Sequence, residues 1–130
     1  MNKTIVFMGA VLGFLSILFG AFGAHALENL INVEAIGTFE TGVRYQMYQA
    51  FFLMILGTWN GLAEKQTKIV FRLILVGTIL FSFSIYLLAM NSLTTIDFKK
   101  IGFLTPIGGT LLLAGWFLFG YSILTKKTVK

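Results

Sequence analysis

The chain has 130 residues, of which 57% are hydrophobic and only 12% are charged, and its mean hydropathy is +0.87. A soluble domain of this size could not bury so much apolar surface, because its surface is large relative to its volume. The sequence contains no cysteine, which excludes disulfides, thiol catalysis and cysteine-based metal sites. The net charge of +5 does not indicate nucleic-acid binding, since the lysines and arginines lie in short segments between apolar blocks.

The apolar residues form four blocks, each long enough to cross a bilayer once. At about 1.5 Å per residue, roughly 20 helical residues cover the ~30 Å hydrocarbon core. We therefore predict an all-α integral membrane protein, a bundle of four transmembrane helices in one transmembrane domain of residues 1–130. The predicted spans are approximately 5–26, 43–62, 69–90 and 106–124.

The first block also has features of a secretory signal. Ala24, His25 and Ala26 form a small-residue cleavage pattern after an apolar run. The run is longer than the usual signal core of about 7–15 residues, and only Lys3 precedes it as a basic residue. A retained transmembrane helix is the preferred interpretation, and cleavage is the alternative.

Basic residues indicate which end of the bundle faces the cytoplasm. With both termini on one side, that side holds more Lys and Arg than the other, so the positive-inside rule places both termini in the cytoplasm. The residues on the cytoplasmic side are Lys3, Lys65, Lys68, Arg72, Lys126, Lys127 and Lys130, and those outside are Arg44, Lys99 and Lys100.

Two helix starts are predicted outside the apolar blocks themselves. Asn32 can cap a helix that begins at Val33, where apolar residues recur at helical spacing. We expect this to be a short interfacial helix between the first two spans, running into the second. Thr105 followed by Pro106 is typical of the start of the fourth span, which would leave Ile101–Leu104 as an interfacial lead-in. A kinked helix that begins earlier is the alternative.

Small residues line up along several of the predicted spans. Helices in lipid associate through close packing of such residues, and Gly9 and Gly13 form a GxxxG pair. Trp116 lies in the middle of the fourth span and should have a buried partner for its N–H. The residues expected to pack helices together are Gly9, Gly13, Ser16, Gly20, Gly23, Gly57, Gly108, Gly109 and Gly115.

Polar residues concentrate where the second span begins, in the stretch "TGVRYQMYQAFFL". Arg44 is predicted near the outer boundary of the hydrocarbon with Glu40 as its local partner; an anion-binding arginine is the alternative. Gln46 and Gln49 share one side of the helix. Hydrogen bonds between helices are the preferred explanation for these amides over a solute path.

The single histidine, His25, lies near the same boundary, three residues before Glu28. One histidine and one nearby acid are too few for a metal site, so we predict no metal and no cofactor. A hydrogen-bonded interface histidine is preferred over a proton-responsive group. The candidate polar cluster comprises His25, Glu28, Glu40, Arg44, Tyr45, Gln46, Tyr48 and Gln49.

Four ordered motifs carry a resemblance over nearly the whole chain: "GAFGAHAL", "FETGVRYQMYQA", "FSFSIYLLAM" and "TPIGGTLLLAGW". They resemble the domain of unknown function 423 family of small bacterial four-helix membrane proteins. The resemblance implies a four-helix protein of the inner or cytoplasmic membrane and supplies no established activity. The family usually has histidine where this chain has Gln49, which argues against a histidine pair with His25. The recurrent family positions fall on Gly20, Gly23, His25, Tyr45, Gln46, Tyr48, Pro106, Gly108 and Gly109.

The preferred function is a structural or accessory membrane component. Its expected partner is the lipid bilayer, and no nucleic acid is expected. The sequence leaves open whether the chain forms a homo-oligomer and whether it binds a small molecule. The sequence offers no activated nucleophile and no phosphate-binding loop, so we expect no enzymatic activity. The alternative is a transporter or channel subunit for ions, protons or small solutes. Its polar route would be lined by Gln46, Gln49, Asn60, Thr78 and Ser82.

Overall fold

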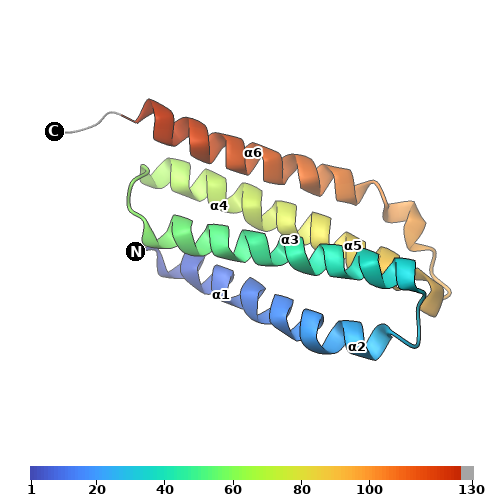
Figure 1. Cartoon of the computed structure of the whole chain (residues 1–130). Helices are drawn as coiled ribbons and strands as arrows, with labels where there is room; N and C mark the ends of the chain where they lie inside the picture. Colours follow the sequence, from blue (N-terminus) through green and yellow to red (C-terminus); the bar gives the residue numbers. More distant parts are fainter. Residues whose placement is uncertain (127–130) are drawn as a thin grey trace.

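The computed structural model describes residues 1–126 and folds them into four helical rods that lie side by side (Figure 1). Each rod covers most of one of the predicted apolar blocks. The first rod is continuous through α1 (Lys3–Leu18), a π-helical segment (Phe19–Gly23) and α2 (Ala24–Leu27), and the second is α3 (Val33–Thr58). The third comprises α4 (Glu64–Thr78), a π-helical segment (Ile79–Phe83) and α5 (Ser84–Ala89). Short 3-10 turns (Asn91–Leu93 and Phe98–Ile101) lead to α6 (Leu104–Thr125).

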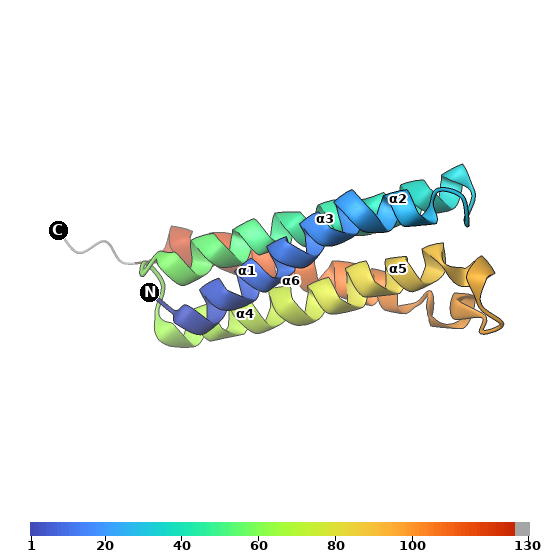
Figure 2. The ribbon, with the colours of Figure 1, turned by 90° about the horizontal axis from the view of Figure 1, so that it is seen from below.

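Successive rods run in opposite directions, so the N-terminus and the end of α6 lie at the same end of the bundle (Figures 1 and 2). The α1 helix packs along α3, α4 packs along α6, and α3 also contacts α5. The core between them is formed by aliphatic side chains with no more than 2% exposure, such as Ile5, Leu53 and Ile74.

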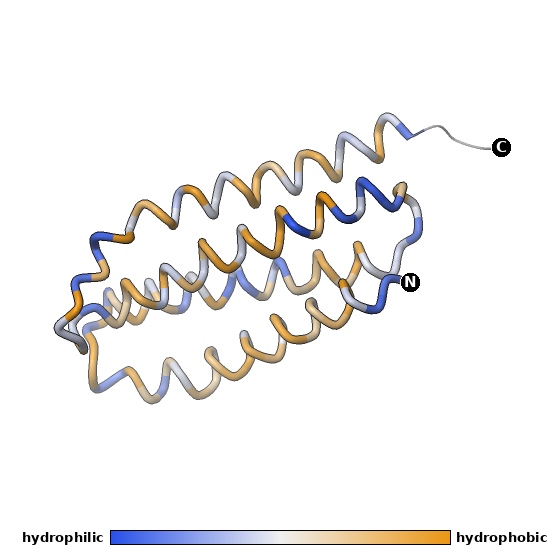
Figure 3. The backbone as a smooth tube through the Cα atoms, turned by 180° about the vertical axis from the view of Figure 1, so that it is seen from behind, coloured by the Kyte–Doolittle hydropathy of each residue, from blue (hydrophilic) through white to orange (hydrophobic). Residues whose placement is uncertain are grey.

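The outer surface of the bundle is strongly apolar. Hydrophobic residues prevail along the rods, and hydrophilic ones gather mainly at the two ends (Figure 3). Large side chains such as Phe14, Leu113 and Phe117 are 67–74% exposed, which suits a lipid environment. Three helical stretches are long and apolar enough to cross a membrane: Lys3–Leu27, Glu64–Ala89 and Phe98–Thr125. The α3 helix is as long but more polar, so its crossing stays a prediction at this point.

The predicted start at Asn32 is confirmed, because its Oδ1 accepts a hydrogen bond from the Ala35 amide at 2.7 Å. The expected interfacial helix is therefore the first part of one continuous α3. The helix ends earlier than predicted, at Thr58 rather than Leu62, since the backbone turns extended at Trp59.

The predicted cap at Thr105 is wrong. The α6 helix begins at Leu104, and no side chain caps it. The Thr105 hydroxyl instead lies 2.6 Å from the hydroxyl of Ser84 in α5. Pro106 still falls in the first helical turn, where its missing N–H costs no helical hydrogen bond.

Basic side chains that entered the orientation argument lie at the end of the bundle that holds the N-terminus. The end with the N-terminus carries an ion pair between Lys68 and Glu64 at 3.2 Å, and Lys126 Nζ lies 5.7 Å from the centre of the Trp59 ring. Lys127 and Lys130, which entered the orientation argument, lie outside the described residues.

Candidate functional site

Gln46 lies at the centre of the bundle and is completely buried. Its Nε2 donates to the Leu12 carbonyl of α1 at 2.9 Å, and its Oε1 accepts from the Tyr86 hydroxyl of α5 at 2.6 Å. A buried amide needs partners for both its donor and its acceptor groups, and Gln46 finds them on two different rods. This one side chain therefore connects α1, α3 and α5.

The partner Tyr86 is held in an aromatic cluster at the end of the bundle away from the N-terminus. Its ring centre lies 5.4 Å from that of Phe19, 5.0 Å from Phe39 and 5.6 Å from Phe83. Gly42 makes room for the ring, because a Cβ there would lie 2.7 Å from Tyr86 Cε1. We did not single out Tyr86 from the sequence, although it lies within the third quoted motif, because its partner is 40 residues away.

The charged residues of the predicted cluster lie at the surface and not beside Gln46. Arg44 is exposed and its Nη2 donates to Thr41 Oγ1 at 3.2 Å; within residues 1–126 no ion pair joins it to Glu40. The expected Glu40 partner is thus replaced by the hydroxyl three residues before the arginine. His25 Nδ1 lies 3.6 Å from Glu28 Oε1, with side chains 81% and 52% exposed.

Several of the predicted packing glycines lie where two backbones approach closely. A Cβ on Gly57 would lie 2.9 Å from the Val6 amide nitrogen of α1, and one on Gly108 would lie 2.4 Å from the Phe81 amide nitrogen. Gly9 is similarly close to the backbone of α3, and a Cβ on Gly115 would lie 2.6 Å from the Ile74 side chain of α4. Gly13, Gly20, Gly23 and Gly109 are less confined. Ser16 uses its hydroxyl within α1, donating to the Leu12 carbonyl at 2.8 Å.

Most of the residues expected to line a polar route use their polar groups in hydrogen bonds within or between helices. Thr78 and Ser82 are fully buried; their hydroxyls donate to the carbonyls of Ile74 at 2.7 Å and Gly42 at 2.9 Å. Asn60 lies exposed beyond the end of α3. Across the part of the chain that the structure describes, these side chains do not share one cavity.

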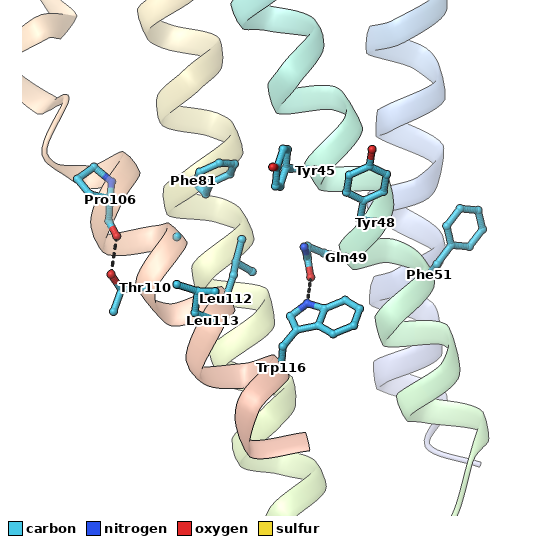
Figure 4. Close-up of a pocket in the computed structure, with 11 residues that line it drawn as sticks. Tyr45, Tyr48, Gln49, Phe51, Phe81, Pro106, Thr110, Leu112, Leu113 and Trp116 are labelled. Atoms are coloured by element: carbon cyan, nitrogen blue, oxygen red, sulfur yellow. Dashed lines mark hydrogen bonds between the residues drawn. The ribbon is translucent and has the colours of Figure 1, made fainter. Parts of the chain in front are cut away.

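A groove of about 780 Å³ lies between α3 and α6, with the third rod behind it (Figure 4). The Trp116 indole Nε1 donates to Gln49 Oε1 across it at 3.0 Å, which confirms the expected buried partner of this tryptophan. Of the predicted cluster, Tyr45, Tyr48 and Gln49 line this groove, and His25 and Arg44 do not.

No group of three or more His, Asp or Glu side chains within residues 1–126 could hold a metal ion. The fold and the hydrogen-bonded core define a small helical membrane protein whose buried polar residues connect its helices.

Comparison with known proteins places the chain in a family. The model of a protein of unknown function (DUF423) matches residues 19–109. A UPF0382 membrane protein of Staphylococcus haemolyticus is 34% identical over 116 residues, covering 89% of this chain and 91% of the relative. The UPF0382 inner membrane protein YgdD of Escherichia coli is 34% identical over 121 residues, covering 90% and 86%. A UPF0382 membrane protein of Haemophilus influenzae is 31% identical over 128 residues, covering 98% of each chain.

The chain therefore belongs to the DUF423 family of membrane proteins, as the four motifs indicated. The names of these relatives state a membrane location and no enzymatic activity. No solved structure matches the chain significantly.

Proposed function

We propose that this protein is a four-span component of the bacterial inner or cytoplasmic membrane with a structural or accessory role, folded as one transmembrane domain. The crossing of α3 follows from the direction of its neighbours. The first and third rods run the same way, so if both cross the membrane they start on the same side (Figures 1 and 2). The chain between them must return across the bilayer, and α3 is the segment available to do so.

The direction of the bundle rests on its basic residues. Lys3, Lys65, Lys68 and Lys126 lie at the end that holds the N-terminus. An excess of lysine and arginine marks the cytoplasmic side of short-looped membrane proteins. Both termini are accordingly assigned to the cytoplasm.

The observation that carries a structural role is the pairing of both the amide nitrogen and the amide oxygen of Gln46 with other rods. Its amide is satisfied by two other rods and is closed to any solute. A residue that served a transport path would present its polar atoms to a cavity, whereas this one fixes the register of helices. The buried Ser82 hydroxyl serves the same end by donating to the Gly42 carbonyl of α3, and the Thr78 hydroxyl is used within its own helix.

Reconstitution separates a structural role from transport. We expect proteoliposomes of the wild-type protein to match empty vesicles in the flux of protons, potassium, amines and organic acids. In cells, Gln46→Leu should lower the amount of folded protein, because a core contact is lost. A saturable flux that Gln46→Leu abolishes while the protein remains abundant would overturn the proposal.

A further inference from the structure

The groove between α3 and α6 lies within the hydrocarbon core in the membrane placement proposed above. Gln49 precedes the end of α3 by nine residues, and Trp116 precedes the end of α6 by the same number. At 1.5 Å per residue both side chains are about 14 Å from the cytoplasmic ends of their helices, and Gln49 is about 8 Å along α3 from Arg44, which is predicted near the outer boundary.

One polar group in this groove has no partner. An indole N–H can only donate, so the hydrogen bond from Trp116 fixes the Gln49 oxygen on that side and leaves the amide nitrogen on the other. Among the described residues, Gln49 Nε2 makes no hydrogen bond, although the residue as a whole is only 5% exposed. The nitrogen points up into the groove towards the two tyrosines (Figure 4). An unpaired amide donor in hydrocarbon is costly, which indicates that an acceptor completes the site.

The other residues that line the groove indicate which kind of molecule could carry that acceptor. Its lining contains no charged side chain, which favours a neutral molecule. Aromatic rings surround the free amide, with Tyr45 and Phe81 ring centres 5.1 Å apart and the Trp116 side chain 49% exposed. Such rings favour offset or edge contacts with another flat ring.

We propose that this groove binds a neutral, lipophilic molecule with a ring carbonyl, the class to which membrane quinones belong. The carbonyl oxygen accepts a hydrogen bond from Gln49 Nε2, and the ring lies among Tyr45, Phe81 and Trp116. Glycerolipid esters carry the same acceptor, but they lie at the edges of the hydrocarbon core, about 15 Å from its centre. Gln49 lies about 8 Å inside the boundary predicted from Arg44, below the level of the ester carbonyls, and this depth favours a molecule that is free within the membrane interior.

Tryptophan fluorescence tests the binding. In a Trp59→Phe background the remaining tryptophan is Trp116, and the protein in phosphatidylcholine nanodiscs is titrated with a singly prenylated 1,4-benzoquinone. We expect saturable quenching, with the apparent Kd raised at least tenfold by Gln49→Leu, which removes the donor, and by Gly109→Leu, which fills the groove. A Cβ at Gly109 would lie 3.6 Å from the Phe81 ring, in ordinary van der Waals contact, so the new side chain starts without a backbone clash.

The matched control is Gly120→Leu on the same helix, where a Cβ meets nothing within 4 Å; its Kd should stay within twofold of the background protein. Quenching that is linear and equal in all variants would show simple partitioning and overturn the proposal. If a prenylated benzene without carbonyl groups displaced the quinone as well as unlabelled quinone does, the groove would accept any hydrocarbon, and the role of Gln49 would be overturned. A Kd at least tenfold lower in ether-linked phosphatidylcholine would assign the groove to lipid ester carbonyls instead.

Discussion

The hydrogen bonds of Gln46 make a quantitative prediction about the stability of the bundle. Gln46→Leu preserves most of the side-chain volume but removes two contacts, to the Leu12 carbonyl and from the Tyr86 hydroxyl. The Leu12 carbonyl keeps the Ser16 hydroxyl as a donor at 2.8 Å, so the buried Tyr86 hydroxyl bears most of the loss. Interhelical hydrogen bonds in membranes are worth about 0.6 kcal/mol on average and up to about 1.7. We expect Gln46→Leu to lower the free energy of unfolding by about 1–3 kcal/mol.

A double-mutant cycle with Tyr86→Phe isolates the shared contact. Tyr86→Phe alone should lower the free energy of unfolding by about 1 kcal/mol. The double variant should lose about 1 kcal/mol less than the sum of the single losses, because both changes remove the same hydrogen bond. The free energies come from titrating dodecyl maltoside micelles with sodium dodecyl sulfate while following helicity by circular dichroism. Ile55→Leu, at an exposed position of α3, is the control and should be near neutral. Strict additivity of the Gln46 and Tyr86 losses would refute the reasoning.

Two further predictions use the same unfolding titration. Gly108→Ala should destabilise by about 1–3 kcal/mol, because the added methyl meets the backbone of the third rod; Gly120→Ala, in open space, should be neutral or slightly stabilising. Equal losses at the two glycines would contradict this difference. His25→Ala should change the free energy of unfolding by less than about 0.5 kcal/mol, because its pair with Glu28 is largely exposed. A larger loss would mean that His25 has a contact beyond that pair.

The arrangement of rods follows closely from hydropathy, but their boundaries and irregularities do not. Long apolar blocks predicted where each rod lies, and Asn32 predicted the start of α3 because capping depends only on nearby residues. Thr105 was misassigned as a cap because its hydroxyl is taken by Ser84, which the sequence places 21 residues away. The π-helical segments in the first and third rods leave no trace in hydropathy, since they change hydrogen-bond spacing and not composition.

The candidate site was predictable only in its local parts. The sequence marked Gln46 and Gln49 as neighbours on one side of a helix, and both are buried in the structure. Their different partners depend on tertiary structure, which the sequence pattern does not show. Gln46 bonds to Tyr86 in α5, and Gln49 bonds to Trp116, 67 residues later in the sequence. The prediction for Arg44 failed for a local reason. Its guanidinium bonds to the Thr41 hydroxyl and not to Glu40, and the sequence pattern does not show which side-chain conformation the arginine adopts.

The central claim is that four helices cross the membrane with both ends in the cytoplasm, and cysteine labelling tests it directly. The chain has no native cysteine, so single-cysteine variants report one position each when intact cells are treated with a membrane-impermeant maleimide. Asn29→Cys and Thr95→Cys should react in intact cells, whereas Lys3→Cys, Asn60→Cys and Lys126→Cys should react only after permeabilisation. Reaction at Asn29 and Asn60 from the same side would show that α3 does not cross, and would contradict the account.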